Sequence, residues 1–241
     1  MRHALATRFL ATLAVLLAIG FPVAGWQQAD ASRDRTLELY TRAIGAELPA
    51  DALYVTGGDV EALYGVPAPQ GRRFPLAQQQ FGLERYVTQV APRLEPRVAG
   101  ARTWSDVMAA AAEQGLTVAG SSPELLALPG AVPELRGLLF VATPGSAADL
   151  SREAVMAAVR LAPIAAELPV LPAQGHAFSR FHQRRFARAF AGAAEQLRRD
   201  GREALFRQAE RAAAEIAEPS PGADRSLLLR AFADSARAAG Y

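Results

Sequence analysis

The stretch TWSDVMAAAAEQGLTVAGSS, residues 103–122, predicts a helix followed directly by a strand. Thr103 can cap this helix because Asp106 at the third position completes a variant of the capping box, and Gly115 is placed to end it. The residues from Leu116 to Ala119 then form a short apolar run that leads into a Gly-Ser-Ser turn. A helix that leads straight into an apolar strand is typical of α/β proteins, whose helices pack on a sheet.

Two more stretches predict strands of the same sheet. Ala52 to Thr56 is mostly apolar and ends at a Gly-Gly pair, and Gly137 to Ala142 is a continuous apolar run, as in sheets that are buried on both faces. Gly65 to Pro75 is rich in proline and glycine and predicts an irregular loop, whereas the turn after residue 119 is expected to open a helix from Glu124 to Leu128. We therefore expect an α/β fold with a parallel or mixed sheet and packed helices.

Apolar residues at helical spacing predict helices on both sides of these strands. Before the C-terminal third, the expected helices cover Thr36–Ala46, Phe81–Ala91, and a segment that Asp149 or Ser151 caps and that runs through Val159.

The C-terminal third is expected to be helical throughout. One stripe of a long helix consists of Phe186, Phe190, Ala194 and Leu197. Asp200 and Glu203 form a D-x-x-E box that would start the next helix, and Ser226 to Ala239 reads as a last amphipathic helix after a Pro-rich linker. These boundaries predict an α/β domain over residues 26–218 and a separate C-terminal helix over residues 223–241.

The first 25 residues predict a signal peptide. Arg2 and Arg8 give a basic start, residues 9–21 are apolar apart from Thr12 and Gly20, and small residues at positions 23–25 suit a signal peptidase. The alternative is an uncleaved membrane anchor, but a spanning helix needs about 20 apolar residues and this run is shorter. We expect a periplasmic protein with the signal peptide cleaved.

The composition excludes several kinds of site. There is no cysteine, so thiolate nucleophiles, disulfides and cysteine-based metal sites are ruled out. All 26 basic residues are arginine, and neither lysine nor asparagine occurs, a bias expected of GC-rich codons. Arginine alone is therefore no sign of specific recognition here, and a formal net charge of +2 gives no case for a nucleic-acid partner.

No motif in the chain points to catalysis. His176 and His182 are the only histidines after the signal, fewer than a zinc site needs, and we expect them in loops or on the surface. Ser121 and Ser122 lie outside a G-x-S-x-G elbow, which leaves an exported hydrolase as a minor alternative. The Gly57-Gly58 and Gly120-Ser121-Ser122 turns follow predicted strands. Either their backbone N–H groups donate hydrogen bonds to a bound anion, or they are ordinary strand–helix turns without a ligand. We expect no catalytic residue, no metal and no cofactor.

An arginine run marks the start of the long C-terminal helix. It consists of Arg180, Arg184, Arg185 and Arg188, with Phe178 and Phe181 beside it. Such a run is either a solvated helix face or a contact for acidic lipid headgroups or RNA. Four acids further along, Glu195, Asp200, Glu203 and Glu210, are expected to balance it, which favours the solvated face.

Two regions resemble the periplasmic solute-binding proteins of family 3, the amino-acid type that serves ABC importers. One is the segment 175–180 (GHAFSR), followed by FARAF at 186–190 and LRRDG at 197–201. The other is FGLE at 81–84, followed by TWSD at 103–106 and the helix and strand that end at Ala119. Val118 departs from the family because an aspartate is usual there, and no arginine follows Ser122 at the place of the carboxylate clamp.

The resemblance implies a non-catalytic protein that binds a small polar solute, an amino acid or a small carboxylate, and that works with a membrane permease or another envelope protein. It places Phe74, Trp104, Ser121 and Ser122 near the ligand cleft, in a fold like that of solute-binding proteins. The stretch between Ala142 and Gly175 is too short for a complete second lobe. The main alternative is an envelope adaptor that docks through its C-terminal helices.

We predict that the mature protein begins near Trp26, because the small residues at 23–25 follow the apolar run and its Pro22 breaker. The intact mass of protein recovered from the periplasm should match this start, or a start after the second candidate triplet at 29–31. Full-length chain in the membrane fraction would contradict cleavage.

Overall fold

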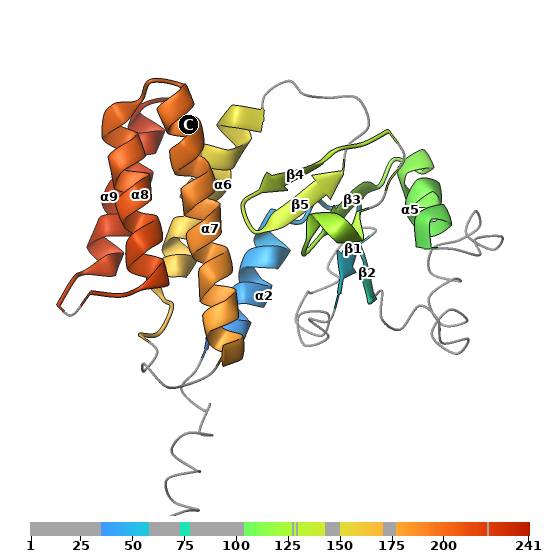
Figure 1. The fold of residues 1–241 in the computed structure, drawn as a ribbon, viewed down its shortest axis with the longest axis horizontal. Helices are drawn as coiled ribbons and strands as arrows, with labels where there is room; N and C mark the ends of the chain where they lie inside the picture. The colour runs from blue at the N-terminus through green and yellow to red at the C-terminus, as the bar shows by residue number, and fades with distance from the viewer. Residues whose placement is uncertain are drawn as a thin grey trace, which may run out of the picture.

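In the computed structural model the chain is a mixed α/β protein, described over residues 35–57, 73–77, 104–126, 128, 130–142, 150–170, 177–220 and 222–241. A sheet lies on one side and a layer of long helices on the other (Figure 1). The predicted signal peptide and the helix expected at Phe81–Ala91 lie outside the described residues. Within the described part, no helix combines the length and apolar character that a membrane span requires.

The sheet has five strands in the order β2-β1-β3-β5-β4. Their bounds are β1 Ala52–Thr56, β2 Arg73–Ala77, β3 Thr117–Gly120, β4 Pro133–Arg136 and β5 Leu139–Ala142. Strand β1 is parallel to β2 and β3, while β3–β5 and β5–β4 are antiparallel, so the sheet is mixed. All residues of β1 and β5 are buried, which agrees with their uninterrupted apolar sequences.

Both edge strands differ from the expectations. The loop prediction for Gly65–Pro75 is wrong at its end, because Arg73 to Pro75 belong to β2. An edge strand tolerates Pro75, since one side of it makes no ladder hydrogen bonds. Strand β4 was not expected, because it has only four residues and begins with a proline, so its alternation of apolar and polar residues is too short to stand out. It pairs with β5 through a turn in which Gly137 adopts φ +58°.

Two predicted helix starts are also wrong. Instead of a helix over Glu124–Leu128, the chain makes one 3₁₀ turn, η4 Pro123–Leu125. Leu128 precedes a proline, which disfavours the helical backbone there. The Asp200 carboxylate does not cap the next helix but accepts from Gln196 Nε2 at 2.8 Å and Tyr241 Oη at 3.3 Å.

The helices are α2 Thr36–Glu47, α5 Trp104–Glu113, α6 Leu150–Ala166, α7 Ala177–Arg199, α8 Glu203–Ala217 and α9 Arg225–Ala238. Helix α7 ends at Gly201, where φ is +67° and Arg202 N donates to Leu197 O at 2.8 Å, a Schellman-type end. Helix α9 begins with a side-chain cap, because Asp224 Oδ1 accepts from Leu227 N at 3.0 Å.

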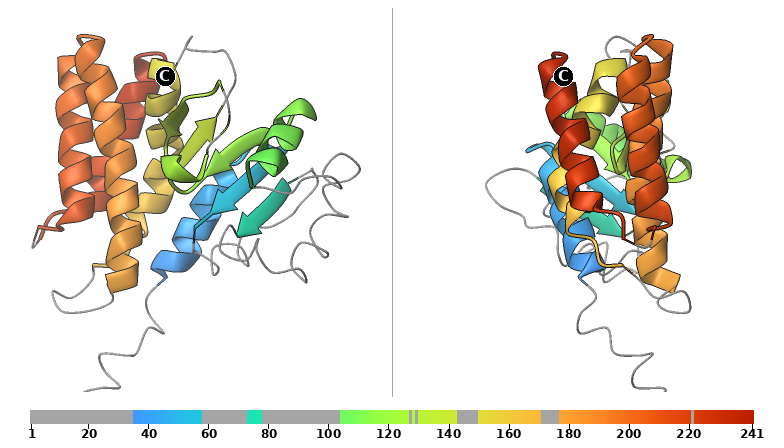
Figure 2. Two further views of the ribbon diagram at one scale, coloured as in Figure 1. Left: turned by 45° about the vertical axis from the view of Figure 1, so that its right-hand side comes forward. Right: turned by 90° about the vertical axis from the view of Figure 1, so that its left-hand side faces the viewer.

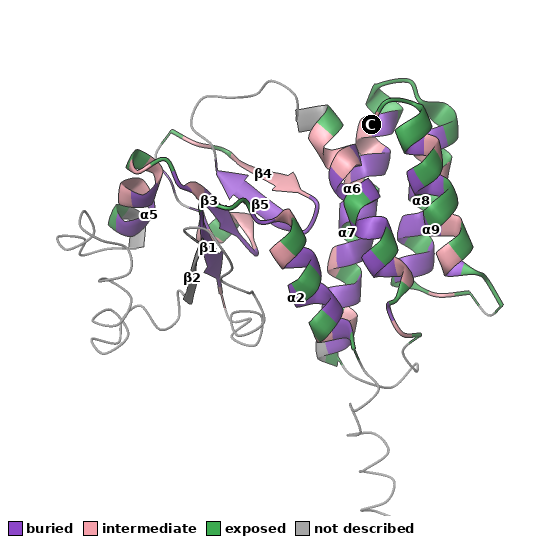
Figure 3. Cartoon of the chain, turned by 180° about the vertical axis from the view of Figure 1, so that it is seen from behind, coloured by how far each residue is buried: buried purple, intermediate pink, exposed green. Residues whose placement is uncertain are grey.

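The long helices pack as a four-helix bundle, which forms the helical layer beside the sheet. Helix α7 packs against α6 and α8, and α9 closes the bundle by packing against α8 and α6 (Figure 2). The helices bury the faces that they turn toward one another and expose the outer faces (Figure 3). Helix α9 contributes to the same apolar core as α6, α7 and α8, so residues 223–241 are packed into the helical layer and do not stand apart from it. A second apolar cluster lies under α5, around Val107, Met108 and Val118.

The predicted stripe on α7 is confirmed. Phe186, Phe190 and Leu197 are each 0% exposed, and Ala194 is buried as well. The ring of Phe190 meets the ring of Phe232 on α9 edge to face, with 5.7 Å between centroids. This stripe therefore joins α7 to the last helix of the chain.

We expect Phe190→Ala to lower the free energy of unfolding by about 3–5 kcal/mol, because it leaves a cavity in a closed core. Denaturant unfolding of the purified protein measures this change. Phe181→Ala on the same helix is the control, since Phe181 is 49% exposed and its loss should cost far less. Equal effects of the two substitutions would contradict the packing.

Candidate functional site

The carboxyl ends of β1 and β3 form the edge at which the sequence placed a ligand. The chain passes from β1 to β2 on one side of β1 and then returns to β3 on the other side. Ligands of open α/β sheets commonly bind at such a switch point, beyond the carboxyl ends of the two strands. Gly57 follows β1, and Ser121 and Ser122 follow β3, so the two predicted turns do meet at this edge.

The side chains of two leucines lie against this edge. A Cβ at Gly120 would lie 2.9 Å from Leu126 Cδ2, and one at Gly57 would lie 3.3 Å from Leu125 Cδ1. Ser121 N donates to Val55 O at 3.0 Å, so this N–H is already used by the sheet. The turn after β3 therefore offers a ligand fewer donors than the sequence suggested.

The hydroxyl of Ser122 is also engaged within the turn, where it donates to the Glu124 carboxylate. That hydrogen bond is the main reason why the pKa of Glu124 lies below its usual value. The carboxylate of the chain itself thus occupies the position expected for a bound anion.

The other two predicted ligand residues lie on flanking elements. Phe74 is the second residue of β2 and pairs with Leu53, near the amino end of the strands and away from the edge that holds Ser121. Trp104 is the first residue of α5, whose other end leads into β3. The side chains of Phe74 and Trp104 are outside the described part of the structure, so their approach to a ligand stays a prediction.

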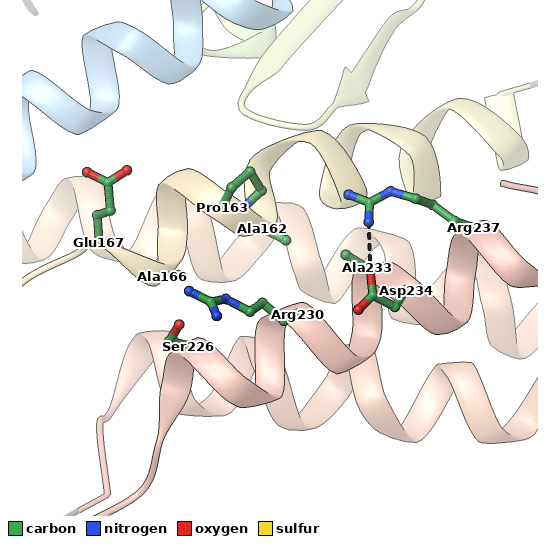
Figure 4. A pocket seen from close by; sticks show the side chains of 9 residues that line it. All are labelled: Ala162, Pro163, Ala166, Glu167, Ser226, Arg230, Ala233, Asp234 and Arg237. Carbon is green, nitrogen blue, oxygen red and sulfur yellow. Dashed lines mark hydrogen bonds and ion pairs between the residues drawn. The ribbon is translucent and has the colours of Figure 1, made fainter.

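A groove of about 340 Å³ lies between α6 and α9 (Figure 4). Three alanines and a proline provide its apolar surface, and five polar or charged side chains surround them. Its lining consists of Ala162, Pro163, Ala166, Glu167, Ser226, Arg230, Ala233, Asp234 and Arg237.

Most charges of this groove are paired with one another or with a neighbouring helix. Asp234 Oδ1 lies 2.8 Å from Arg237 Nη1, and Glu167 Oε1 lies 2.5 Å from Nη2 of Arg42 on α2. Arg230, by contrast, makes no hydrogen bond or ion pair with any described residue. Among the described residues, the Arg230 guanidinium is therefore the one charged group of the groove without an ion-pair partner.

Ser226 lies one helical turn before Arg230, so both side chains are on the same face of α9. Both extend into the groove in Figure 4, and the Ser226 hydroxyl has no hydrogen-bond partner among the described residues. An arginine fork and a hydroxyl donor side by side can bind a carboxylate. From the sequence, Ser226 and Arg230 are simply polar positions of an amphipathic helix. The spacing of polar and apolar residues does not show that α6 packs beside them.

A second cavity, of about 450 Å³, continues from this groove around the start of α9 and shares Ala166 and Ser226 with it. Arg225 lines it and is only 9% exposed, with Nε and Nη1 buried and without a hydrogen-bond partner. Burial lowers the pKa of Arg225, and the charge of the buried Glu215 opposes this effect. Glu215 Oε1 in turn accepts from Ser220 N at 2.8 Å, so this acid also holds the α8–α9 connection.

The described residues contain no group of three or more side chains able to hold a metal ion. His182 is not on the surface as expected but is 0% exposed, with its ring 4.2 Å from the ring of Tyr40. Its position on the buried side of α7 explains the difference, because the helix packs this side against α2. His176 lies outside the described residues.

Comparison with known protein families, with curated proteins and with solved structures gives no match for this chain. The resemblance to solute-binding proteins therefore stays a prediction from the sequence.

One buried carboxyl group has a strongly raised pKa. Glu47 ends α2 and accepts from Leu138 N at 2.8 Å through Oε2, while Oε1 is buried without a partner. Burial raises its pKa from 4.5 to about 8, and Glu153 on α6 adds to this, whereas the Leu138 N–H and Arg160 on α6 oppose it. A Cβ at Gly137 would lie 2.0 Å from Glu47 Oε1, so the β4–β5 turn closes directly over the carboxyl group.

This group should make the stability of the fold depend on pH. The folded chain holds the Glu47 proton more tightly than the unfolded chain, so the free energy of unfolding falls as the pH rises from about 5 to about 8. The loss is at most about 1.4 kcal/mol for each pH unit. We expect Glu47→Gln to remove this contribution and to be more stable than the wild type at pH 8.

Urea unfolding of both proteins at several pH values in this interval measures the difference. Glu38→Gln on the same helix is the control, because Glu38 is exposed and its pKa is lowered by Arg35, so it stays charged throughout. A constant difference between wild type and Glu47→Gln across the interval would contradict the buried acid.

Proposed function

We propose that this chain is an exported, non-catalytic binding protein for a small polar solute that carries a carboxylate. The observation that supports this most directly is Arg230, whose guanidinium group has no ion-pair partner among the described residues and lies in a groove whose other charges are paired. A ligand carboxylate would accept from Arg230 and from the Ser226 hydroxyl, and charge-assisted hydrogen bonds of this kind are about twice as strong as neutral ones.

The size and surface of the groove favour a ligand as small as an amino acid or a short carboxylic acid. Its 340 Å³ lie at the lower end of the range of about 300–1,000 Å³ for small-molecule sites. Ala162, Ala166 and Ala233 offer methyl groups to the apolar part of such a ligand. The two acids of the groove are already paired, so a carboxylate meets little uncompensated negative charge there.

The proposed site differs in place from the one that the resemblance implied. A solute-binding protein of that family holds its ligand between two lobes, whereas the described strands of this chain form one sheet. The helical layer supplies the concave surface instead. Export and periplasmic localisation remain part of the proposal and depend on the predicted signal peptide.

We expect amino acids or small carboxylates to raise the melting temperature of the exported protein in a thermal-shift screen. Binding to the folded state alone stabilises it by about 2.7 kcal/mol at a hundred-fold excess over Kd. In a chain of this size that corresponds to a shift of roughly 5–10 °C. Arg230→Gln should abolish the shift.

Arg211→Gln is the matched control, because Arg211 is an exposed arginine on α8 that lines a different cavity, of about 310 Å³, and not the α6–α9 groove. A hit that survives Arg230→Gln and disappears with Trp104→Ala would move the site back to the strand ends and overturn the groove. If no compound shifts the transition, solute binding itself is wrong.

A further inference from the structure

The first half of α7 carries a second group of positively charged side chains, which lie on one side of the helix. Phe181, Arg184, Arg185 and Arg188 follow one another at intervals of three and one residues, which places them on one face of the helix, here called the Arg face. Phe181, Arg184 and Arg188 are exposed and Arg185 is half-buried. The opposite side of α7 is the buried stripe around Phe190, so packing of the core turns the Arg face outward.

Three of the four acids expected to neutralise this face, Glu195, Asp200 and Glu203, are engaged elsewhere. Glu195 accepts from Arg198 and Arg199, and Glu203 accepts from Arg207. The first turn of α7 contains no acid, and Arg184 and Arg188 form no ion pair with a described residue. Glu124 is near enough to Arg188 for the arginine to lower its pKa, without an ion pair between them.

Aromatic rings hold two of these guanidinium groups in place. Arg188 lies over the ring of Phe140, with 5.4 Å from Cζ to the centroid. Arg185 lies 5.2 Å from the ring centroid of Phe181 and 5.5 Å from that of Tyr40, to whose hydroxyl it also donates. Stacked arginines lose less side-chain freedom when they bind, so the face is partly organised before any partner arrives.

We propose that the Arg face docks the protein on the anionic headgroups of a phospholipid membrane. The arginine fork matches phosphate oxygens in pairs, and Phe181 adds an exposed apolar ring of the kind that interfacial helices bury at the boundary between headgroups and acyl chains. A single-stranded nucleic acid fits less well, because such partners stack successive bases on several aromatic side chains, and among the side chains that the structure describes Phe181 is the one exposed aromatic ring of this face. The proposal is independent of solute binding in the α6–α9 groove.

Co-sedimentation with vesicles tests the proposal on the exported protein. We expect binding to vesicles of phosphatidylglycerol and phosphatidylethanolamine, little binding to phosphatidylcholine vesicles, and weaker binding as salt is added. The double variant Arg184→Gln/Arg188→Gln should bind anionic vesicles about 30-fold more weakly, because each arginine near such a surface contributes a factor of about five.

The control is Arg207→Gln/Arg211→Gln on α8, which removes the same charge from another helix and should bind like the wild type. Melting curves of both double variants establish that each is folded. If the control variant binds anionic vesicles as weakly as the Arg184→Gln/Arg188→Gln variant, net charge alone drives binding. If the wild type binds neutral vesicles as tightly as anionic ones, the protein recognises no anionic headgroup. Tighter binding of a single-stranded oligonucleotide than of anionic vesicles would also overturn the proposal.

Discussion

The whole helical layer depends on the burial of one side of α7. Phe186, Phe190 and Leu197 face inward together, and each buried side chain of this size contributes about 1.5–3 kcal/mol relative to exposure. Through Phe232 the same stripe fixes α9. Because a helix has only one side opposite its apolar stripe, this packing also decides that Phe181, Arg184 and Arg188 face outward. The core thus determines which charges the protein presents.

The sequence predicts the elements whose character is set by neighbouring residues. Strands β1 and β5 are continuous apolar runs, and the long helix carries an apolar stripe, so these patterns are visible without knowledge of the fold. Strands β2 and β4 are edge strands. Each contains a proline, so its sequence resembles a loop until the neighbouring strand is known. The 3₁₀ turn after β3 is likewise set by its surroundings, because Leu125 and Leu126 pack against Gly57 and Gly120.

The candidate sites show the same limit. Sequence patterns correctly brought Ser121 and Gly57 to one and the same edge of the sheet, since parallel strands end together. They could not show that two leucines lie against that edge or that Glu124 takes up the Ser122 hydroxyl. Arg230 and Ser226 gain significance only because α6 packs beside them, through small residues such as Ala162 and Ala166 that let two helices approach closely. Whether one side of an amphipathic helix lines a groove depends on which helix packs next to it, and the sequence of the helix alone does not show this.

Every basic residue of this chain is arginine, so residue type alone does not distinguish the arginines that bind a ligand from those that only face water. The structure provides a criterion in the pairing of charges. Arg198, Arg207 and Arg237 each form ion pairs with acids three or four residues away on their own helices, as solvated helix surfaces commonly do. An unpaired arginine is still not a site, because water can hydrate an exposed guanidinium group at little cost. Arg230 and the Arg face differ in that the first lies in a groove beside a free hydroxyl, and the second includes guanidinium groups stacked on aromatic rings. At Arg184, Arg188 and Arg230 the described residues supply no anion for the guanidinium group, and a carboxylate or a phosphate headgroup would provide one.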